Sequence, residues 1–499
     1  MIRPRLVLAT LGLIVQAFGA LMLLPLAIAV LYQEWSSAAH FALTGVLAAL
    51  VGYLMSGLVP SRTFDDLDRV EGMAVVAFGW LLVAGCGAIP YLCLGLSLID
   101  SLFESMSGFT TTGATIFTDF TVYSRSLFFF RGFTQWLGGM GILVLFVAIL
   151  PMLSVAGRQL FFAETSAASK EKLTPRIRDT ARHLWGWYIF LTLLETLLLM
   201  AVGMPANDAI CNSMATLAAG GFSPHGQSIM GYANPRAEWI IIVFMFLAGA
   251  NFTLQVRALR GNLRALWENV ELQGYVGIVL VSSLALFFIL GQDPTVGWSL
   301  STLRTALFQN ISILTTTGFA SVDFQLWTDR AKVVLAFLML IGGCSGSAGG
   351  GIKVIRALFL VKFLARQMIR AIHLKAVIPI RLGRRIFMDH EFQPILGFIG
   401  LYFTLFLTGG ILTAILENDL IVGFSGSIVT LGNIGPGFGV IGPMGSFAGL
   451  TTATKAIYFF LMWAGRLEVV TLLALFQREL WPSWRTLLRR SEPGSAPQT

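Results

Sequence analysis

Long apolar segments, separated by short polar links, run along almost the whole of this chain. The stretches of about 6–32 and 38–60 can each cross a bilayer, because a membrane span needs roughly 20 apolar residues. Beyond them the order becomes a long apolar segment, a short apolar stretch, an uncharged loop with glycine, and a second long apolar segment. This order occurs four times, and the whole pattern predicts about ten membrane spans and four half-helices.

The four glycine loops are the most unusual part of the pattern. Two of them, at 110–113 and 315–318, read Thr-Thr-Thr-Gly, and related loops lie at 215–223 and 431–439. The glycines taken as equivalent are Gly113, Gly220, Gly318 and Gly435. In this register Ser105 is matched by other small hydrogen-bonding residues, namely Asn212, Asn310 and Ser427. Irregular backbone at membrane depth is tolerated only where it is buried in protein or lines a water-filled path, so the loops predict a pore.

The repeat defines the expected fold class and domain organisation. We expect an all-α polytopic membrane protein with four span–pore-helix–span repeats around one pseudo-four-fold pore, plus an N-terminal two-helix pair. The expected parts are the two-helix pair at 1–60, pore repeats at 61–157, 158–264, 265–375 and 376–490, and a disordered tail at 491–499. The third repeat contains a further glycine-rich loop within the membrane.

Composition supports the membrane interpretation. The chain is 56% hydrophobic and only 12% charged, whereas soluble domains have about 25% charged residues. The net charge of +8 is therefore interpreted as topology, and no soluble basic module predicts nucleic-acid binding. The four cysteines lie in apolar stretches and the five histidines are scattered, so neither type predicts a metal site. We expect no organic cofactor on this chain.

The links between repeats carry the arginine and lysine clusters, whereas the segments with the glycine loops carry few basic residues. The positive-inside rule then places both termini and the links in the cytoplasm, and the glycine loops open to the outside. The links at 158–182 and 362–385 are also candidates for binding a cytosolic partner, and charge reversal at Arg384 and Arg385 would test this. Orientation signals alone are the alternative explanation.

The glycine loops have the chemistry of a cation filter. A dehydrated cation needs oxygen ligands, and backbone carbonyls supply them without net charge. Glycine allows positive φ angles that point carbonyls inward, and the negative dipole end of each half-helix would face the ion. Glu104 is a candidate hydrogen-bond anchor for the first loop. The candidate ion-binding residues are Thr111, Thr112, Gly113, Ala219, Gly220, Gly221, Thr316, Thr317, Gly318, Asn433, Ile434 and Gly435.

A second unusual stretch, at 342–353, interrupts the second span of repeat three with glycine and serine. It does not match a phosphate-binding loop, because Ile352 separates Gly351 from Lys353. A glycine-rich break at mid-depth predicts a mobile gate, and a packed flexible bend is the alternative. Arg466 lies inside the last span and is expected to face the pore or this break, unless it reaches the membrane surface. The candidate gate residues are Gly346, Gly349, Gly350, Gly351, Lys353 and Arg466.

The motif at 103–113, the four-fold repeat, the glycine break ending in Lys353 and the late Arg466 together resemble the Trk/Ktr/HKT potassium transporter superfamily. The resemblance covers almost the whole chain and is strongest to the bacterial members. It implies potassium as the transported substrate, a bacterial inner-membrane location, a homodimer, and a cytosolic nucleotide-binding regulatory subunit similar to TrkA. It also implies that the glycine break is a gate. Sodium-carrying plant relatives have serine at the first filter glycine, whereas Gly113 is intact here.

Two alternatives stay open at the level of sequence. One is a sodium-permeable or proton-coupled symporter of the same fold, because repeats two and four lack the three threonines. The other is a polytopic membrane enzyme, although the scattered histidines argue against a catalytic constellation at a membrane face.

Overall fold

The computed structural model describes residues 3–57, 69–149, 177–294, 296–373, 378–383, 385–387 and 392–467. These residues are mostly helical, and their only sheet is a hairpin of β1 (Ile380–Leu382) and β2 (Arg385–Phe387). Six helical segments are long and apolar enough to cross a membrane, or seven if one bent pair counts as a span, within these described ranges. The predicted all-α polytopic fold is therefore confirmed. The predicted tail at 491–499 lies outside the described residues.

An N-terminal helical pair packs against the side of the repeats. It consists of α1 (Pro4–Leu21) continued by α2 (Leu23–Leu31), and of α3 (Trp35–Ser56). Gly12 and Gly52 let the two backbones approach closely, because a Cβ on either glycine would lie within 3.0 Å of the other's carbonyl oxygen. The side chain of Arg3 pairs with the buried Glu71 at 2.7 Å, which ties the start of α1 to the first repeat.

Each repeat contains a short helix between longer ones. The short helices are α6 (Leu98–Phe109), α10 (Ala206–Leu217), α15 (Leu300–Leu314) and α19 (Leu420–Leu431). The preceding helices are α4 (Arg69–Gly87) with α5 (Ile89–Cys93), α9 (Ile177–Ala201), α14 (Val270–Gly291) and α18 (Phe392–Glu417). The following helices are α7 (Arg125–Ile149), α11 (Pro235–Gly249) with α12 (Phe252–Leu259), α16 (Asp329–Met339) with α17 (Val354–Ile372), and α20 (Thr452–Arg466). The remaining short elements are α13 (Arg264–Glu268) and the 3₁₀ helices η3 (Ser228–Tyr232), η4 (Phe324–Leu326) and η6 (Gly439–Ile441).

Polar caps start three of the short helices. Ser97 accepts a hydrogen bond from the amide of Asp100, Ser299 from that of Thr302, and Asp419 from that of Ile421. Such caps satisfy backbone donors that the first helical turn leaves unpaired. The fourth short helix, α10, follows Pro205 and has Asp208 in its first turn. The local sequence therefore fixes where each half-helix begins.

Two of the following helices are broken, one of them unexpectedly. The sequence predicted a continuous second span in repeat two, but the chain turns by 103° between α11 and α12. Asn251 stabilises this break, because its Oδ1 accepts from the amide of Leu254 and its Nδ2 donates to the carbonyl of Ser345. The break in repeat three was predicted, and α16 ends there at Met339.

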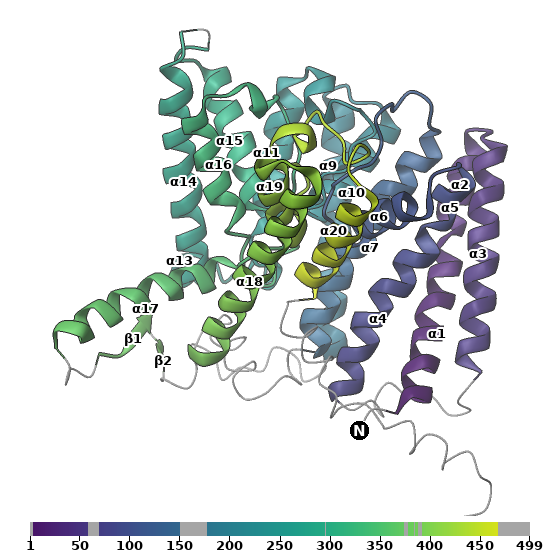
Figure 1. Ribbon diagram of the computed structural model, residues 1–499, viewed down its shortest axis with the longest axis horizontal. Helices are drawn as coiled ribbons and strands as arrows, with labels where there is room; N and C mark the ends of the chain where they lie inside the picture. The colour runs from purple at the N-terminus through teal and green to yellow at the C-terminus, as the bar shows by residue number, and fades with distance from the viewer. Residues whose placement is uncertain are drawn as a thin grey trace, which may run out of the picture.

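The long helices stand side by side, and α17 leaves the bundle with the β hairpin beside it (Figure 1). Large apolar side chains are exposed on the outer faces of α3, α14 and α18, as with Val46, Val281 and Ile415. A soluble protein rarely exposes such extended apolar surface, which suits contact with lipid.

Candidate functional site

The four glycine loops meet one another in a closed ring. In each loop one glycine lies against a backbone carbonyl of the next loop, and a Cβ there would come within 3.0 Å of that oxygen. The pairs are Gly113 with Gly220 oxygen, Gly221 with Thr317 oxygen, Gly318 with Ile434 oxygen and Gly435 with Thr112 oxygen. The contacts run from repeat one to two, three, four and back to one. The predicted filter residues are therefore brought together at one place by four separate repeats.

All four loops have the same backbone conformation. The residue after each half-helix cap has a positive φ angle: Thr111 (54°), Ala219 (55°), Thr316 (60°) and Asn433 (54°). Two residues later the glycine is again positive: Gly113 (82°), Gly221 (74°), Gly318 (79°) and Gly435 (105°). Between them, the amides of Thr112, Gly220, Thr317 and Ile434 donate to carbonyls five residues earlier at 2.8–2.9 Å. Left-handed backbone at non-glycine residues costs about 1–3 kcal/mol each, and such strain clusters at functional sites.

This geometry corrects the sequence register of repeat two. Gly221, and not Gly220, is structurally equivalent to Gly113, so Ser213 rather than Asn212 corresponds to Ser105. Asn212 instead corresponds to Glu104. Two adjacent glycines made both alignments plausible from sequence, and only the backbone hydrogen bonds distinguish them. The twelve predicted residues still form four equivalent triplets.

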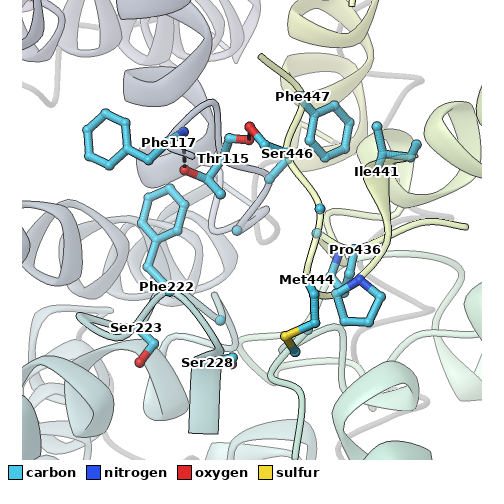
Figure 2. A pocket seen from close by; sticks show the side chains of 18 of the residues that line it. Thr115, Phe117, Phe222, Ser223, Ser228, Pro436, Ile441, Met444, Ser446 and Phe447 are labelled. Carbon is cyan, nitrogen blue, oxygen red and sulfur yellow. Dashed lines mark hydrogen bonds between the residues drawn. The ribbon is translucent and has the colours of Figure 1, made fainter. Parts of the chain in front are cut away.

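A cavity of about 250 Å³ lies against the ring and touches Gly113, Gly221, Gly318 and Gly435. Figure 2 shows Thr115 of loop one and Phe222 of loop two next to each other on one side of this space, with Pro436 of loop four on the other. The segment around Met444 closes the side next to loop four. The cavity is therefore shared by all four repeats.

A buried ion pair supports the first two loops. Glu104 on α6 accepts from the amide of Ile116 at 2.9 Å and from the hydroxyl of Thr115 at 3.0 Å. The guanidinium of Arg131 on α7 donates to the same carboxylate at 2.6 Å and lies 4.0 Å from the ring centre of Phe222 in loop two. Glu104 thus anchors loop one as predicted. Sequence reasoning missed Arg131, whose only signal was a single charge within an apolar helix.

The other loops are held by different side chains. The side-chain amide of Gln135 on α7 forms two hydrogen bonds with loop two. Its Nε2 donates to the carbonyl of Gly220, and its Oε1 accepts from the backbone amide of Phe222. Asn433 in loop four donates to the hydroxyl of Thr112 at 2.9 Å and to the carbonyl of Met462. The Thr111 hydroxyl and the Asn433 Oδ1 are buried and have no hydrogen-bond partner among the described residues.

The glycine break at 342–353 folds into a loop pressed against the ring, which we call the intramembrane loop. Its ends meet where the amide of Gly342 donates to the carbonyl of Ile352 at 2.7 Å. The amide of Gly350 donates to the hydroxyl of Thr316 in loop three at 2.7 Å. A Cβ at Gly350 would lie within 3.0 Å of the Gly432 carbonyl, next to loop four. The loop therefore contacts two of the four filter loops.

Two charged side chains stabilise the intramembrane loop, one on α14 and one within the loop itself. Glu271 on α14 accepts from the amide of Ser345 at 2.7 Å, and Lys353 donates to the carbonyl of Gly349. Gly346 and Gly351 both have positive φ angles, so the loop depends on glycine. Glu271 was not predicted from sequence.

Arg466 lies on the other side of the intramembrane loop, within α20. It is 1% exposed, and its guanidinium donates to the carbonyl of Ala348 at 3.1 Å and to that of Gly138 on α7 at 3.0 Å. The side chain therefore faces the glycine break and does not reach the membrane surface. All six predicted gate residues lie in or against this loop.

A helical membrane bundle whose single chain closes four loops around one cavity defines the class of polytopic cation transporters. The sequence model of the TrkH family, described as "Cation transport protein", matches residues 63–484, and the chain belongs to this family. The family is one of transporters, which confirms the predicted resemblance and excludes the membrane-enzyme alternative.

Individual relatives agree over nearly their whole length. The Trk system potassium uptake protein TrkH of Salmonella typhimurium is 37% identical over 479 residues, which cover 94% of this chain and 98% of the relative. TrkH of Escherichia coli K12 is 36% identical over 480 residues, with the same coverage. The crystal structure of the potassium transporter TrkH from Vibrio parahaemolyticus superposes with a TM-score of 0.88 at 32% identity, covering 96% of this chain and all of that chain.

Proposed function

We propose that this protein carries potassium into a bacterial cell across the inner membrane, through a pore whose selectivity filter is the ring of four glycine loops. The closed ring of glycine-to-carbonyl contacts carries this proposal. Four half-helices end at the ring, so their negative dipole ends favour a cation there. The unpaired oxygens of Thr111 and Asn433 are available as further ligands. Relatives named as potassium uptake proteins support potassium as the substrate.

Replacing Gly113 with serine tests the filter. The new Cβ would meet the carbonyl of Gly220 within 3.0 Å at a φ angle of +82°, so both loops must shift. We expect the preference for potassium over sodium to fall by about tenfold or more, since a loss of 1.4 kcal/mol at one ion site is a factor of ten. The measurement is rubidium and sodium uptake into proteoliposomes.

Gly95→Ser is the matched control for this variant. Gly95 also has a positive φ angle, +87°, but a Cβ there has no neighbour within 4 Å. It should therefore reproduce the backbone strain without disturbing the ring. An unchanged ion preference in Gly113→Ser would contradict the filter assignment, and equal rubidium and sodium uptake by the unmodified protein would favour the sodium-permeable alternative.

The intramembrane loop is proposed as the gate, with Gly346, Gly349, Gly350, Gly351, Lys353 and Arg466 as its working residues. Its contacts with loops three and four support a position across the ion path. Deleting residues 346–350 should raise potassium flux and make it less dependent on a regulator. The deletion removes the carbonyl acceptor of Lys353 and one of the two acceptors of Arg466, whereas Gly342 and Ile352 still join the loop ends. A folded deletion variant that conducts like the unmodified protein would place the gate elsewhere.

The proposed assembly is a homodimer with both termini in the cytoplasm and a TrkA-like nucleotide-binding subunit on the cytoplasmic face. Basic residues at the ends of α1, α12 and α17, such as Arg3, Arg260 and Arg370, support this orientation. The basic segment 158–176 and Arg384 lie outside the described residues. Light scattering would detect a mass of twice 54.3 kDa for the dimer. Co-purification would detect the partner, and a monomer without a bound protein would contradict the assembly.

A further inference from the structure

Glu195 is a carboxylic acid buried in the middle of α9 without a hydrogen-bond partner. Its side chain is 0% exposed, and neither carboxyl oxygen makes a hydrogen bond with any described residue. The helix around it is apolar enough to cross a membrane. An isolated ionised carboxylate in such surroundings is very costly, so buried acids are normally paired or neutral.

The other buried acids of the described chain all have partners. Glu71 and Glu104 pair with arginines, as does Glu238, which accepts from Arg304 at 2.8 Å. Glu271 accepts from two backbone amides of the intramembrane loop region. Glu195 alone among these five is neither paired with a cation nor hydrogen-bonded. Its burial therefore requires another form of neutralisation.

The polar side chain that approaches Glu195 is that of Thr216 on the half-helix α10. The Thr216 hydroxyl donates its only hydrogen to the carbonyl of Asn212 at 2.7 Å, which leaves lone pairs towards Glu195. The Thr192 hydroxyl, one turn earlier on α9, donates to the carbonyl of Tyr188 and accepts from Trp136. An ionised carboxylate can only accept hydrogen bonds, so only a protonated Glu195 matches these neighbours.

This acid lies directly behind the second filter loop. The carbonyl of Thr216 accepts a hydrogen bond of 3.0 Å from the amide of Ala219, the first residue of that loop. The carbonyl end of α10 carries the negative end of the helix dipole. A negative charge on Glu195 would therefore be repelled by the last turn of α10, which positions the carbonyls of loop two.

We propose that Glu195 is a proton-binding site and that the ion path conducts only while this proton is bound. The bound proton neutralises the carboxyl group and is donated towards the Thr216 hydroxyl. On release the proton passes to solvent and leaves a carboxylate behind α10, which displaces the end of that helix and loop two with it. The functional part of this inference rests on the proposed role of loop two in the filter.

Other ionisable groups on the helices packed against α9 do not supply a counter-charge. Those on the partner helices are Arg125 and Arg131 on α7, Asp208 and Cys211 on α10, Arg236 and Glu238 on α11, and Arg257 on α12. On α9 itself they are Arg178, Asp179, Arg182, His183 and Tyr188. Arg125, Arg182, His183 and Arg236 are exposed. Arg131 and Glu238 are paired elsewhere, and the hydroxyl of Tyr232 donates to Asp208. Neither oxygen of the Glu195 carboxyl contacts a cationic side chain or a hydrogen-bond donor of the described residues. No described side chain therefore neutralises the Glu195 carboxylate, which leaves a bound proton as the neutralising species.

Glu195→Gln separates the proton from the shape of the side chain, because glutamine is neutral at every pH and can still donate to Thr216. We expect rubidium uptake by the unmodified protein to fall by about tenfold per pH unit once the proton dissociates at alkaline pH, as for a single titrating site. The Glu195→Gln variant should take up rubidium as fast as the unmodified protein at neutral pH, and its uptake should not fall at alkaline pH. Asp329→Asn, at a side chain that is 98% exposed, is the control and should follow the unmodified profile.

Infrared difference spectroscopy of the purified protein supplies a readout that is independent of transport. A protonated carboxyl band that is present at neutral pH, absent in Glu195→Gln and retained in Asp329→Asn would establish the proton site. Absence of that band would overturn the site itself. If the band is present but Glu195→Gln has the same pH profile of uptake as the unmodified protein, the control of flux by Glu195 is overturned. In that case a loss of selectivity in Gly113→Ser would still support the filter.

Discussion

Replacing Arg466 with alanine is expected to increase potassium flux by about tenfold or more. The guanidinium holds the carbonyl of Ala348 in the intramembrane loop against that of Gly138 on α7. Each charge-assisted hydrogen bond contributes about 1.5–3 kcal/mol, and 1.4 kcal/mol is a factor of ten in an equilibrium. Removing both bonds, together with a positive charge next to a cation path, should shift the loop towards an open state. The measurement is rubidium uptake into proteoliposomes, normalised to inserted protein.

Two further variants separate the contributions of charge and shape. Arg466→Met keeps much of the buried volume and should conduct as fast as the alanine variant. Arg466→Lys keeps the charge but loses the planar fork that holds two carbonyls, so its flux should be intermediate. Arg236→Ala, at an exposed arginine at the start of α11, controls for a general loss of positive charge. A decrease or no change in flux for Arg466→Ala would make the residue structural.

Replacing Arg131 with methionine is expected to lower both the stability of the protein and its ion selectivity. The substitution leaves Glu104 buried and unpaired, and breaking a buried pair in this way costs about 3–5 kcal/mol. Loops one and two would lose a common support, because the guanidinium contacts both the Glu104 carboxylate and the Phe222 ring. Thermal unfolding in detergent and the rubidium-to-sodium uptake ratio measure the two effects.

The double variant Glu104→Gln with Arg131→Met tests whether the cost comes from the unpaired charge. It should recover part of the lost stability but not the selectivity, since the glutamine is no longer oriented by the guanidinium. Arg264→Met is the control. Arg264 forms an ion pair with Glu268, but its own side chain is 81% exposed, so its loss should leave the thermal unfolding temperature unchanged. A stable and selective Arg131→Met variant would contradict the supporting role.

The loops of the proposed filter could be located from sequence because residues within each loop determine its conformation. A short capped helix, a residue that enters the left-handed region and a glycine two positions later occur within one loop, as at Thr111 and Gly113. The register of repeat two could not be fixed in this way, because Gly220 and Gly221 satisfy the same pattern. Only the bond from the amide of Gly220 to the carbonyl of Ala215 resolves it.

Features that depend on distant residues escaped the sequence analysis. Arg131 lies 27 residues after Glu104, and nothing local to either residue specifies their pairing. The turn between α11 and α12 lies at Ala250 and Asn251, directly after Gly249, and the Asn251 side chain that stabilises it donates to a carbonyl of the intramembrane loop. Glu195 stands in a leucine-rich run, where its burial follows from the packing of α9 on α10 and not from its neighbours in sequence.

The intramembrane loop occurs once in the described chain, although the filter loops occur four times. A pore built from four identical subunits would carry four copies of such a loop, which would have to move together or obstruct the path one by one. Here a single chain has one copy, fastened to loop three through Thr316 and to α20 through Arg466. The proposed gate therefore acts through one event per pore. We expect each pore to open without cooperativity among its repeats. A signal that reaches this one loop should be sufficient to open the pore.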